Sequence, residues 1–263
     1  MKPWRHDTPA SVVHDGKAAC VVDLGLVDYA AVRALQLALV EKRRSGQPVD
    51  DVFLVTEHPR TFTLGRRGGR RHLMVSEEFL RERQIPLLHI ERGGDITYHG
   101  PGQLVVYPIV HLRQAGLGVA EYVCCLEEIM LRLAAESGVV AGRDPRNHGV
   151  WAGGKKLGSV GIAIRHGITF HGLALNVSLD LAPFSWVNPC GLAGVQMTSL
   201  SRECGRQVEV GALKKDLLGQ LTRIFGRPFI PLSKENLHVI VHKPEPFGQT
   251  QMAEAQSADR TGI

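Results

Sequence analysis

The sequence has 263 residues, a net charge of +5 and five cysteines. A chain of this length is typical of one folded domain with short extensions, and it can bury a core without disulfides or bound metals. An odd number of cysteines without a CxxC pair excludes a disulfide framework and a zinc ribbon. No stretch approaches about 18 consecutive apolar residues, and the N-terminus has no apolar core. We therefore expect no membrane span, no secretion signal and a cytoplasmic location.

The chain divides into one folded domain and two flanking segments. Residues 1–16 are predicted to be an N-terminal arm, residues 17–241 the domain, and residues 242–263 a polar, disordered tail. In chain order, the predicted elements are a strand at 18–22, a helix from Asp28 to Arg44, a strand at 52–56, a Gly/Arg loop at 65–71, a helix at 76–84, strands at 87–90 and 103–111, a helix at 119–137, several short strands within 148–178 and a helix at 209–225. Adjacent runs of strands with helices between the runs indicate an α+β fold, a mixed sheet with flanking helices.

A glycine-rich segment between two predicted strands reads RGGDITYHGPG over residues 92–102. Glycine lets the backbone come close to a ligand, and successive N–H groups can hold an anion or a carbonyl oxygen. Arg92 and His99 add donors that suit an anion. The segment is predicted to be either a binding loop or the polar loop of a hairpin.

A second glycine segment, GVWAGGKK at residues 149–156, is similar to the phosphate loop of nucleotide hydrolases. That loop requires a hydroxyl side chain where this sequence has Lys156, and a helix must follow it. The next residues alternate instead as in a strand, so we reject a nucleotide site here. The twelve histidines include no HExxH motif, and no metal site is predicted.

Two of the cysteines are candidates for a reactive thiol. Cys20 lies in an apolar strand, and Cys124 and Cys125 lie in a helix, where thiols are usually inert. Cys190 follows a proline and precedes a glycine, and Cys204 lies in a polar, basic stretch. A nucleophilic thiol must be accessible and close to positive charge, and the local sequence allows either residue.

Several long motifs together resemble one family, the octanoyltransferases of lipoate biosynthesis, also called lipoyl(octanoyl) transferases. The motifs are RGGDITYHGPGQLVVYPI, GKKLGSVGIAIR, FHGLALNVSLDL and NPCGL, with TFTLGRRG upstream. The resemblance implies a catalytic domain with the fold of biotin and lipoate protein ligases. It also implies transfer of an octanoyl group from octanoyl-acyl carrier protein to a lysine of a lipoyl-accepting domain. Such acceptors are the E2 subunits of 2-oxoacid dehydrogenases and the glycine-cleavage H protein.

The resemblance also assigns roles to individual residues. It implies that Cys190 carries the acyl group as a thioester and that Lys156 activates this thiol. The adjacent Lys155 is an alternative to Lys156, and only the register to Gly161 chooses between them. The resemblance also implies that substrate contacts are made by Arg92, Gly93, Gly94, Asp95, Ile96, Thr97, Tyr98, His99, Ser159, Val160, Gly161, Gly172, Leu173 and Ala174. Because the donor is already a thioester, no ATP, other cofactor or metal is expected.

The acyl chain and the carrier protein lead to two further hypotheses. Val105, Ile162 and Leu173 are expected to form an apolar wall for the acyl chain. A group of four arginines, Arg66, Arg67, Arg70 and Arg71, is expected to dock the acidic carrier protein.

Two alternatives remain from the sequence. A ligase of the same fold would activate its acid with ATP and would need no cysteine. The arginine runs would also suit a nucleic-acid-binding module, but aromatic residues make up only 6% of the chain, which leaves little stacking surface, so no nucleic-acid partner is expected.

Overall fold

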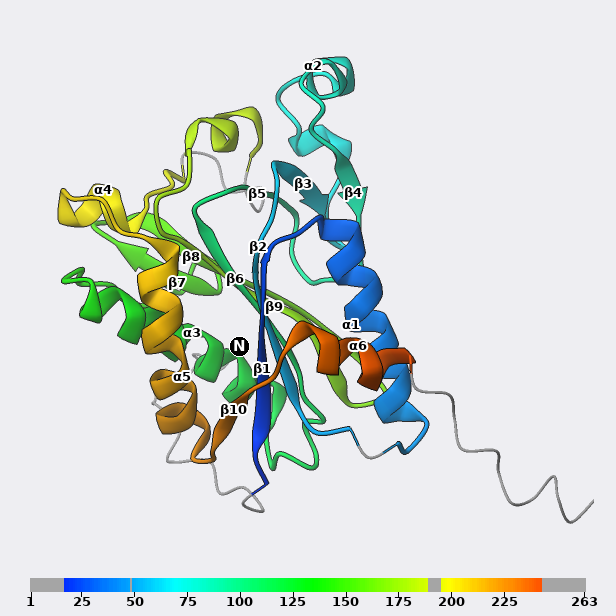
Figure 1. Ribbon diagram of the computed structural model, residues 1–263. Coiled ribbons are helices and arrows are strands. Elements are labelled where there is room, and N and C mark those ends of the chain that lie inside the picture. Colours follow the sequence, from blue (N-terminus) through cyan, green and yellow to red (C-terminus); the bar gives the residue numbers. More distant parts are fainter. Residues whose placement is uncertain (1–16, 48, 189–194, 243–263) are drawn as a thin grey trace, which may run out of the picture.

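A computed structural model describes residues 17–47, 49–188 and 195–242 of the chain. The predicted N-terminal arm, Cys190 and nearly all of the predicted tail lie outside these residues. Figure 1 shows a central sheet with helices on both faces and a smaller layer at one end. Within the described ranges, no helix is long and apolar enough to cross a membrane.

The large sheet has seven strands in the order β10-β1-β2-β6-β9-β8-β7. The strands in this order are β10 (Phe229–Pro231), β1 (Ala19–Leu26), β2 (Val52–Glu57), β6 (Gln103–Ile109), β9 (Ile168–Asn176), β8 (Lys155–Arg165) and β7 (Gly149–Ala152). β10, β1 and β2 are parallel, and the pairs from β2 to β7 are antiparallel. The predicted mixed sheet is therefore confirmed.

A second sheet of three strands lies beyond one end of the large sheet. It contains β4 (Leu87–His89), β3 (Thr61–Leu64) and β5 (Ile96–His99), with β3 in the middle. The short helix α2 (Glu77–Glu82) and the 3-10 turns η1 (Arg70–His72) and η2 (Ala182–Trp186) belong to the same end of the molecule. This layer has its own apolar core, which includes Phe62, Tyr98 and Phe184.

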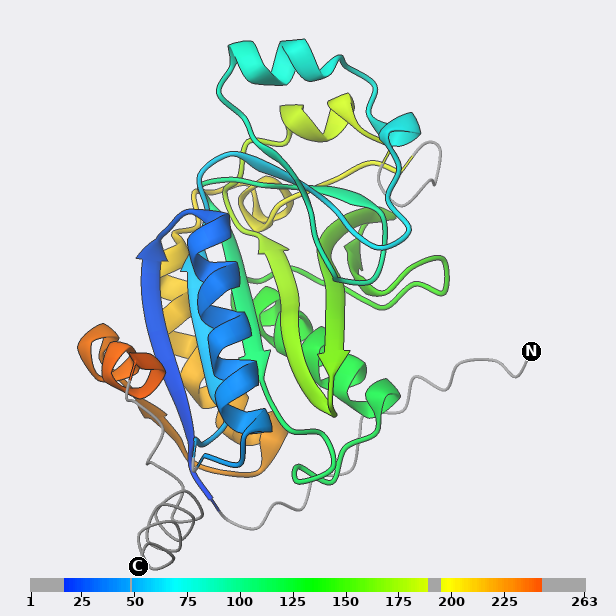
Figure 2. The same cartoon turned by 90° about the vertical axis from the view of Figure 1, so that its right-hand side faces the viewer.

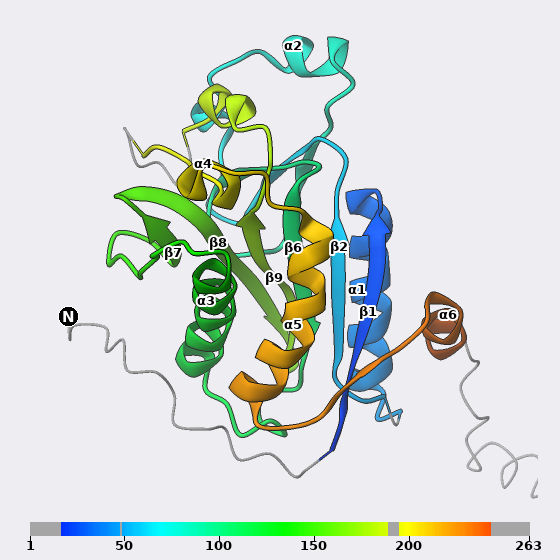
Figure 3. The same cartoon turned by 60° about the vertical axis from the view of Figure 1, so that its left-hand side comes forward.

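Helices cover both faces of the large sheet. Figure 2 shows α1 (Tyr29–Arg44) across one face, and Figure 3 shows α3 (Val119–Glu136) and α5 (Val210–Phe225) side by side on the other. The remaining helices are α4 (Leu200–Cys204) and α6 (Lys234–His242), which packs beside α1 and β1. Strand β6 is buried along its whole length because both of its faces are covered.

Helix ends and strand patterns explain why most of these elements form where the sequence predicts them. The Asp28 side chain accepts hydrogen bonds from Ala30 N at 2.8 Å and Ala31 N at 3.2 Å, which starts α1 at the predicted cap. Along β6, alternate residues enter opposite cores: Val106 packs towards α3, and Val105 packs towards α1. The predicted helices at 119–137 and 209–225 are confirmed within a residue at each end.

The prediction differs from the structure in several places. Residues 148–178 form one short strand and two long ones, since β8 has 11 residues and β9 has 9, where several short strands were expected. His166 and Gly167 join them as a tight turn, with φ of +51° and +77°. Ile96–His99, expected inside a loop, is strand β5. The sequence analysis did not identify β3, α4, β10 or α6.

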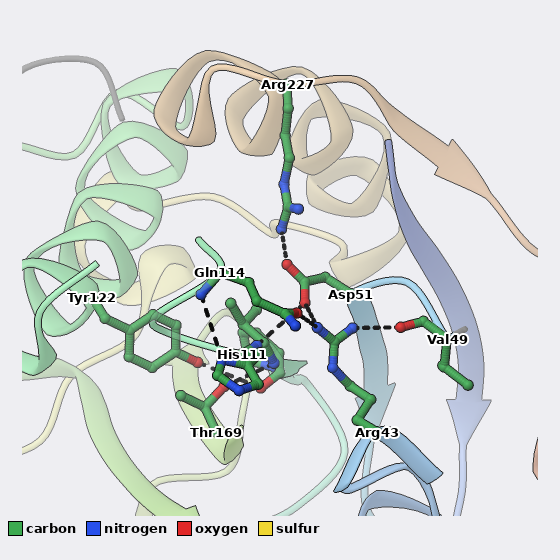
Figure 4. A network of polar contacts seen from close by, with 10 residues as sticks. Arg43, Val49, Asp51, His111, Gln114, Tyr122, Thr169 and Arg227 are labelled. Carbon is green, nitrogen blue, oxygen red and sulfur yellow. Dashed lines mark hydrogen bonds and ion pairs between the residues drawn. The ribbon is translucent and has the colours of Figure 1, made fainter. Parts of the chain in front are cut away.

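A buried ion cluster connects four segments at the end of the large sheet away from the three-stranded sheet (Figure 4). Asp51, which is 6% exposed, lies between the guanidinium groups of Arg43, at 2.8 Å, and Arg227. Its Oδ1 also accepts a hydrogen bond from His111 N at 3.3 Å. The carboxylate therefore holds together the end of α1, the start of β2, the end of β6 and the segment after α5.

Replacing Asp51 with alanine is expected to destabilise the fold by about 3–5 kcal/mol, because two buried guanidinium groups would lose their counter-charge. Urea unfolding measures this as a lower midpoint. Asp180→Ala is the matched control, since its pair with Arg60 spans 3.6 Å and both side chains are about half exposed. That pair should contribute less than about 1 kcal/mol. Equal effects of the two substitutions would contradict the assignment.

Candidate active site

A cavity of about 700 Å³ lies where β8, β9 and the segment at residues 92–97 meet. The strand register places small side chains opposite each other here: Ser159 pairs with Ala174, and Gly161 pairs with Gly172. Paired residues of antiparallel strands share a face of the sheet. All four border the cavity, so this part of the sheet is hollow because its side chains are small.

A β-bulge brings Lys156 to the same face as Ser159. Gly149 pairs with Ser159 and Val150 with Gly158, but the register then shifts, and Trp151 pairs with Lys156. Because Gly149 and Trp151 share a face of β7, their partners also share one, although they are three residues apart. A bulge of this kind redirects a side chain.

The two adjacent lysines have different surroundings. Lys156 is 2% exposed, borders the cavity and donates from Nζ to the carbonyl oxygen of His148 at 3.1 Å. Its Nζ also lies 5.5 Å from the centre of the Trp151 ring. Lys155 is partly exposed, with Nζ 3.6 Å from a carboxylate oxygen of Glu203, and does not border the cavity. The geometry therefore favours Lys156 over Lys155 for a role in the cavity.

Arg92 fixes the glycine-rich segment over the sheet. Its guanidinium donates to the carbonyl oxygen of Thr63 at 2.7 Å and to the Thr63 hydroxyl at 2.9 Å. Gly93 N donates to the carbonyl oxygen of Ile162 at 2.8 Å, which ties the segment to β8. A Cβ at Gly161 would lie 3.1 Å from Arg92 Cδ, a tight contact, so the absence of a side chain favours this close approach.

Of the fourteen residues that the family resemblance implies in substrate binding, thirteen border the cavity and Tyr98 does not. Tyr98 alternates to the other face of β5 and packs in the core of the small layer. Its ring centre lies 5.1 Å from that of Phe62 and 5.6 Å from that of Phe184. Leu173 and Val160 border the cavity, although their side chains pack in the core on the α3 side.

The proposed apolar wall is similarly divided. Val105, Ile162 and Leu173 all border the cavity. Only Val105 belongs to the core on the α1 side, whereas Ile162 and Leu173 pack towards α3. Val105 therefore shares its face of the sheet with Ala174.

Sequence reasoning missed a buried polar group that forms part of the cavity lining. Tyr29, Tyr107 and His171 border the cavity together with His99, and the Tyr29 hydroxyl lies 3.3 Å from His171 Nδ1. Burial lowers the pKa of His171 to about 4 and that of His99 well below its usual value. Burial also raises the pKa of Tyr29 to about 12. These side chains are therefore uncharged at neutral pH, and this part of the wall is polar but neutral.

Also missed were a glutamate of α3 and the segment before β7, which border the cavity at the side where Lys156 lies. They are Glu127, Arg143, Asp144, Pro145, Arg146, Asn147 and His148. The one available signal was Glu127 itself, a charged residue on the apolar face of the predicted amphipathic helix.

Cys190 lies outside the described residues, but the chain on both sides of it is anchored. Before it, Asn188 N donates to the carbonyl oxygen of His72 at 2.8 Å. After it, the Lys156 main chain pairs with the chain around Met197: Lys156 N donates to Gln196 O at 2.8 Å, and Thr198 N donates to Lys156 O at 2.9 Å.

None of the four cysteines that the structure describes borders the cavity. Burial raises the pKa of Cys20, Cys124 and Cys125, which agrees with their predicted inertness. Cys204 is partly exposed at the end of α4, with Sγ 3.5 Å from the carbonyl oxygen of Arg206.

Comparison with known proteins shows the family to which the chain belongs. Residues 28–222 match the lipoyl protein ligase A/B catalytic domain. An octanoyltransferase of Desulfotalea psychrophila is 55% identical over 208 residues, which cover 78% of this chain and 93% of the relative. An octanoyltransferase of Syntrophobacter fumaroxidans is 45% identical over 211 residues, which cover 80% and 92%. The chain belongs to the octanoyltransferase family.

Family membership confirms the resemblance that the sequence motifs indicated. Solved structures confirm the fold. A bipartite lipoate protein ligase from Thermoplasma acidophilum superposes with a TM-score of 0.66 at 15% identity, over 86% of this chain and 91% of that one. A lipoate-protein ligase A bound with ATP gives 0.64 at 16% identity, over 86% and 92%. At such low identity, these structures establish only that the fold is shared.

Proposed function

We propose that the chain transfers an octanoyl group from octanoyl-acyl carrier protein to a lysine of lipoyl-accepting domains, through a thioester on Cys190. The acceptors would be lipoyl domains of E2 subunits and the glycine-cleavage H protein, and the reaction would take place in the cytoplasm. Membership of the octanoyltransferase family makes the chain an acyltransferase. The observation that carries the proposal is the position of Lys156. Its buried amine lies at the cavity, and its main chain pairs with Gln196, which is six residues after Cys190.

The reaction has two acyl transfers. The Cys190 thiolate attacks the thioester carbonyl of the donor, the bond to the carrier sulfur breaks, and the carrier leaves as a thiol after taking up a proton. The acceptor amine then attacks the new thioester, loses a proton and releases the Cys190 thiolate. A free cysteine has a pKa of about 8.5 and is mostly protonated at neutral pH. An ammonium beside it favours the thiolate, so Lys156 would stabilise the nucleophile and carry both protons.

The cavity would hold the acyl chain. Burying about seven apolar carbons at roughly 0.8 kcal/mol each contributes about 6 kcal/mol, which favours octanoyl over acetyl groups. Two of the four arginines, Arg67 and Arg71, border the cavity, and Arg70 pairs with Glu77 at 2.6 Å. This placement supports a role of the arginines in docking an acidic carrier protein at the mouth.

Ala174→Leu is expected to change the acyl-chain preference, because the added carbons would enter the cavity between Val105 and Ser159. Transfer of octanoyl should fall about 15- to 60-fold relative to hexanoyl or butanoyl, as two or three lost methylene contacts at about 0.8 kcal/mol each would predict. Competition between donors of different length measures the ratio. Ala163→Leu is the matched control, because Ala163 lies in the neighbouring strand β8 but does not border the cavity, and it should keep the original preference. An unchanged ratio in Ala174→Leu would rule out this position of the acyl chain.

Intact-mass spectrometry tests the proposed function directly. On mixing with octanoyl-carrier protein, the chain should gain one octanoyl group without ATP, and hydroxylamine should remove it as it removes a thioester. Addition of a lipoyl domain should then move the group to that domain. A transfer that starts from free octanoate and requires ATP would instead indicate a ligase.

A further inference from the structure

Glu127 is a charged side chain on the otherwise apolar, buried face of α3. It is 3% exposed, and burying a carboxylate is costly unless hydrogen bonds and opposite charges compensate for it. Its Oε1 accepts from Gly149 N at 2.9 Å and lies 3.4 Å from His148 Nδ1. Its Oε2 accepts from Arg143 Nε at 3.1 Å. All three partners belong to the segment that leads into β7.

The peptide group between His148 and Gly149 has contacts on both sides. Its N–H donates to Glu127, and its carbonyl oxygen accepts from Lys156 Nζ at 3.1 Å. A trans peptide is planar, with its N–H and C=O pointing in opposite directions, so fixing one of these groups fixes the other. Glu127 and Lys156 are therefore joined through a single rigid group.

We infer that Glu127 is a positioning residue that holds the Lys156 amine at the cavity through the His148–Gly149 peptide. This rests on the proposed role of Lys156. A carboxylate that accepts from the N–H also polarises the peptide and makes its carbonyl oxygen a better acceptor. The protonated form of Lys156 is stabilised as a result.

The backbone at Gly149 shows that this connection demands a particular residue. Its φ is +124°, and a Cβ there would lie 2.2 Å from the carbonyl oxygen of Gly158. Only glycine can occupy the position without moving β8. The peptide can therefore reach both Glu127 and Lys156 only because residue 149 has no side chain.

Glu127 is ionised at neutral pH. Burial alone raises its pKa, but the contacts with His148, Gly149 N–H and Arg143 outweigh burial, and the pKa lies below its ordinary value. The segment 143–148 brings Asp144 close enough to Lys156 for the two charges to interact. Asp144 is held by Arg146, at 2.6 Å and 2.8 Å, and the Arg146 guanidinium lies 4.4 Å from the centre of the Trp151 ring. Asp144 is thus already paired and does not take the place of Glu127.

The test compares Glu127→Gln with Glu128→Gln. The amide oxygen of the first variant still accepts from Gly149 N, but the charge is lost. Glu128 is a matched control because it lies on the same helix but pairs with Arg143, at 3.0 Å, and with Arg132, at 2.9 Å, instead of with the His148–Gly149 peptide. Amine labelling with acetic anhydride across a range of pH, followed by mass spectrometry of the peptide containing Lys156, gives the protonation midpoint of this lysine.

In Glu127→Gln, the midpoint of Lys156 should fall by about one pH unit, and labelling near pH 8 should rise severalfold. In Glu128→Gln, the midpoint should match that of the unmodified chain. A variant that unfolds at a lower temperature but labels as before would show that Glu127 is merely structural and would overturn the inference. An equal shift in both variants would also overturn it.

A measurement on the unmodified chain covers the case in which Glu127→Gln fails to fold. The 15N resonance of Gly149 should titrate with the same midpoint as Lys156, because Lys156 donates to the carbonyl group bonded to that nitrogen. If the Gly149 resonance does not shift as Lys156 titrates, the proposed contact between Lys156 and the His148–Gly149 peptide is refuted. Neither measurement uses an octanoyl donor. Failure of the chain to form an octanoyl adduct would thus count against the proposed function and leave these shifts unaffected.

Discussion

Replacing Lys156 with methionine should reduce octanoyl transfer by about 10³-fold, the usual contribution of a positioned proton-transfer group. Methionine has nearly the length of lysine and fits a buried site, but it has no ammonium to stabilise a thiolate. The main-chain pairing with Gln196 and Thr198 does not depend on the side chain, so the chain after Cys190 should stay anchored. The loss then reports on the chemistry and not on the fold.

Lys155→Met provides the matched control for this result. The two residues are adjacent in β8, but the Lys155 amine lies beside Glu203 and away from the cavity. Its pair is partly exposed and should contribute little, so transfer should stay within about twofold of the unmodified chain. Initial rates of transfer to a lipoyl domain, with thermal melts of both variants, measure the difference. Equal losses in the two variants would remove the reason to choose Lys156.

Replacing Cys190 with alanine should abolish both the octanoyl adduct and the transfer. Without a thiolate there is no nucleophile to accept the acyl group, and direct attack by the acceptor amine on the donor lacks an activated intermediate. Intact-mass spectrometry should show no mass gain in this variant. Cys204→Ala should form the adduct normally. An adduct retained in Cys190→Ala and lost in Cys204→Ala would reverse the assignment.

Local signals were sufficient for much of the fold. The cap at Asp28 started α1 as predicted, and the β-branched run at 103–111 was recognisable as a strand, which the structure ends at Ile109. The prediction was wrong where it took glycines as the end of a strand. Ile96–His99 was expected to be loop because glycines flank it, yet it pairs with β3, a partner more than thirty residues earlier in the sequence. Such a pairing cannot be seen from either segment alone.

The site was predictable as a set of motifs but not as a geometry. The alternation of β5 turns Tyr98 away from the face of Thr97 and His99, which border the cavity on either side of it in the sequence. The bulge that places Lys156 with Ser159 breaks the strand periodicity, and no local pattern signals it. Tyr29, Tyr107 and His171 come from three separate elements, so only the folded chain brings them together.

The cavity has a consequence for how its selectivity can vary. It exists where Ser159, Gly161, Gly172 and Ala174 leave the sheet surface bare, next to the segment at residues 92–97. At Ser159 and Ala174, one added carbon at a time can therefore shorten the available length while the strands keep their register. Point substitutions in such a sheet can therefore change the acyl-chain preference, without loop exchange or domain rearrangement.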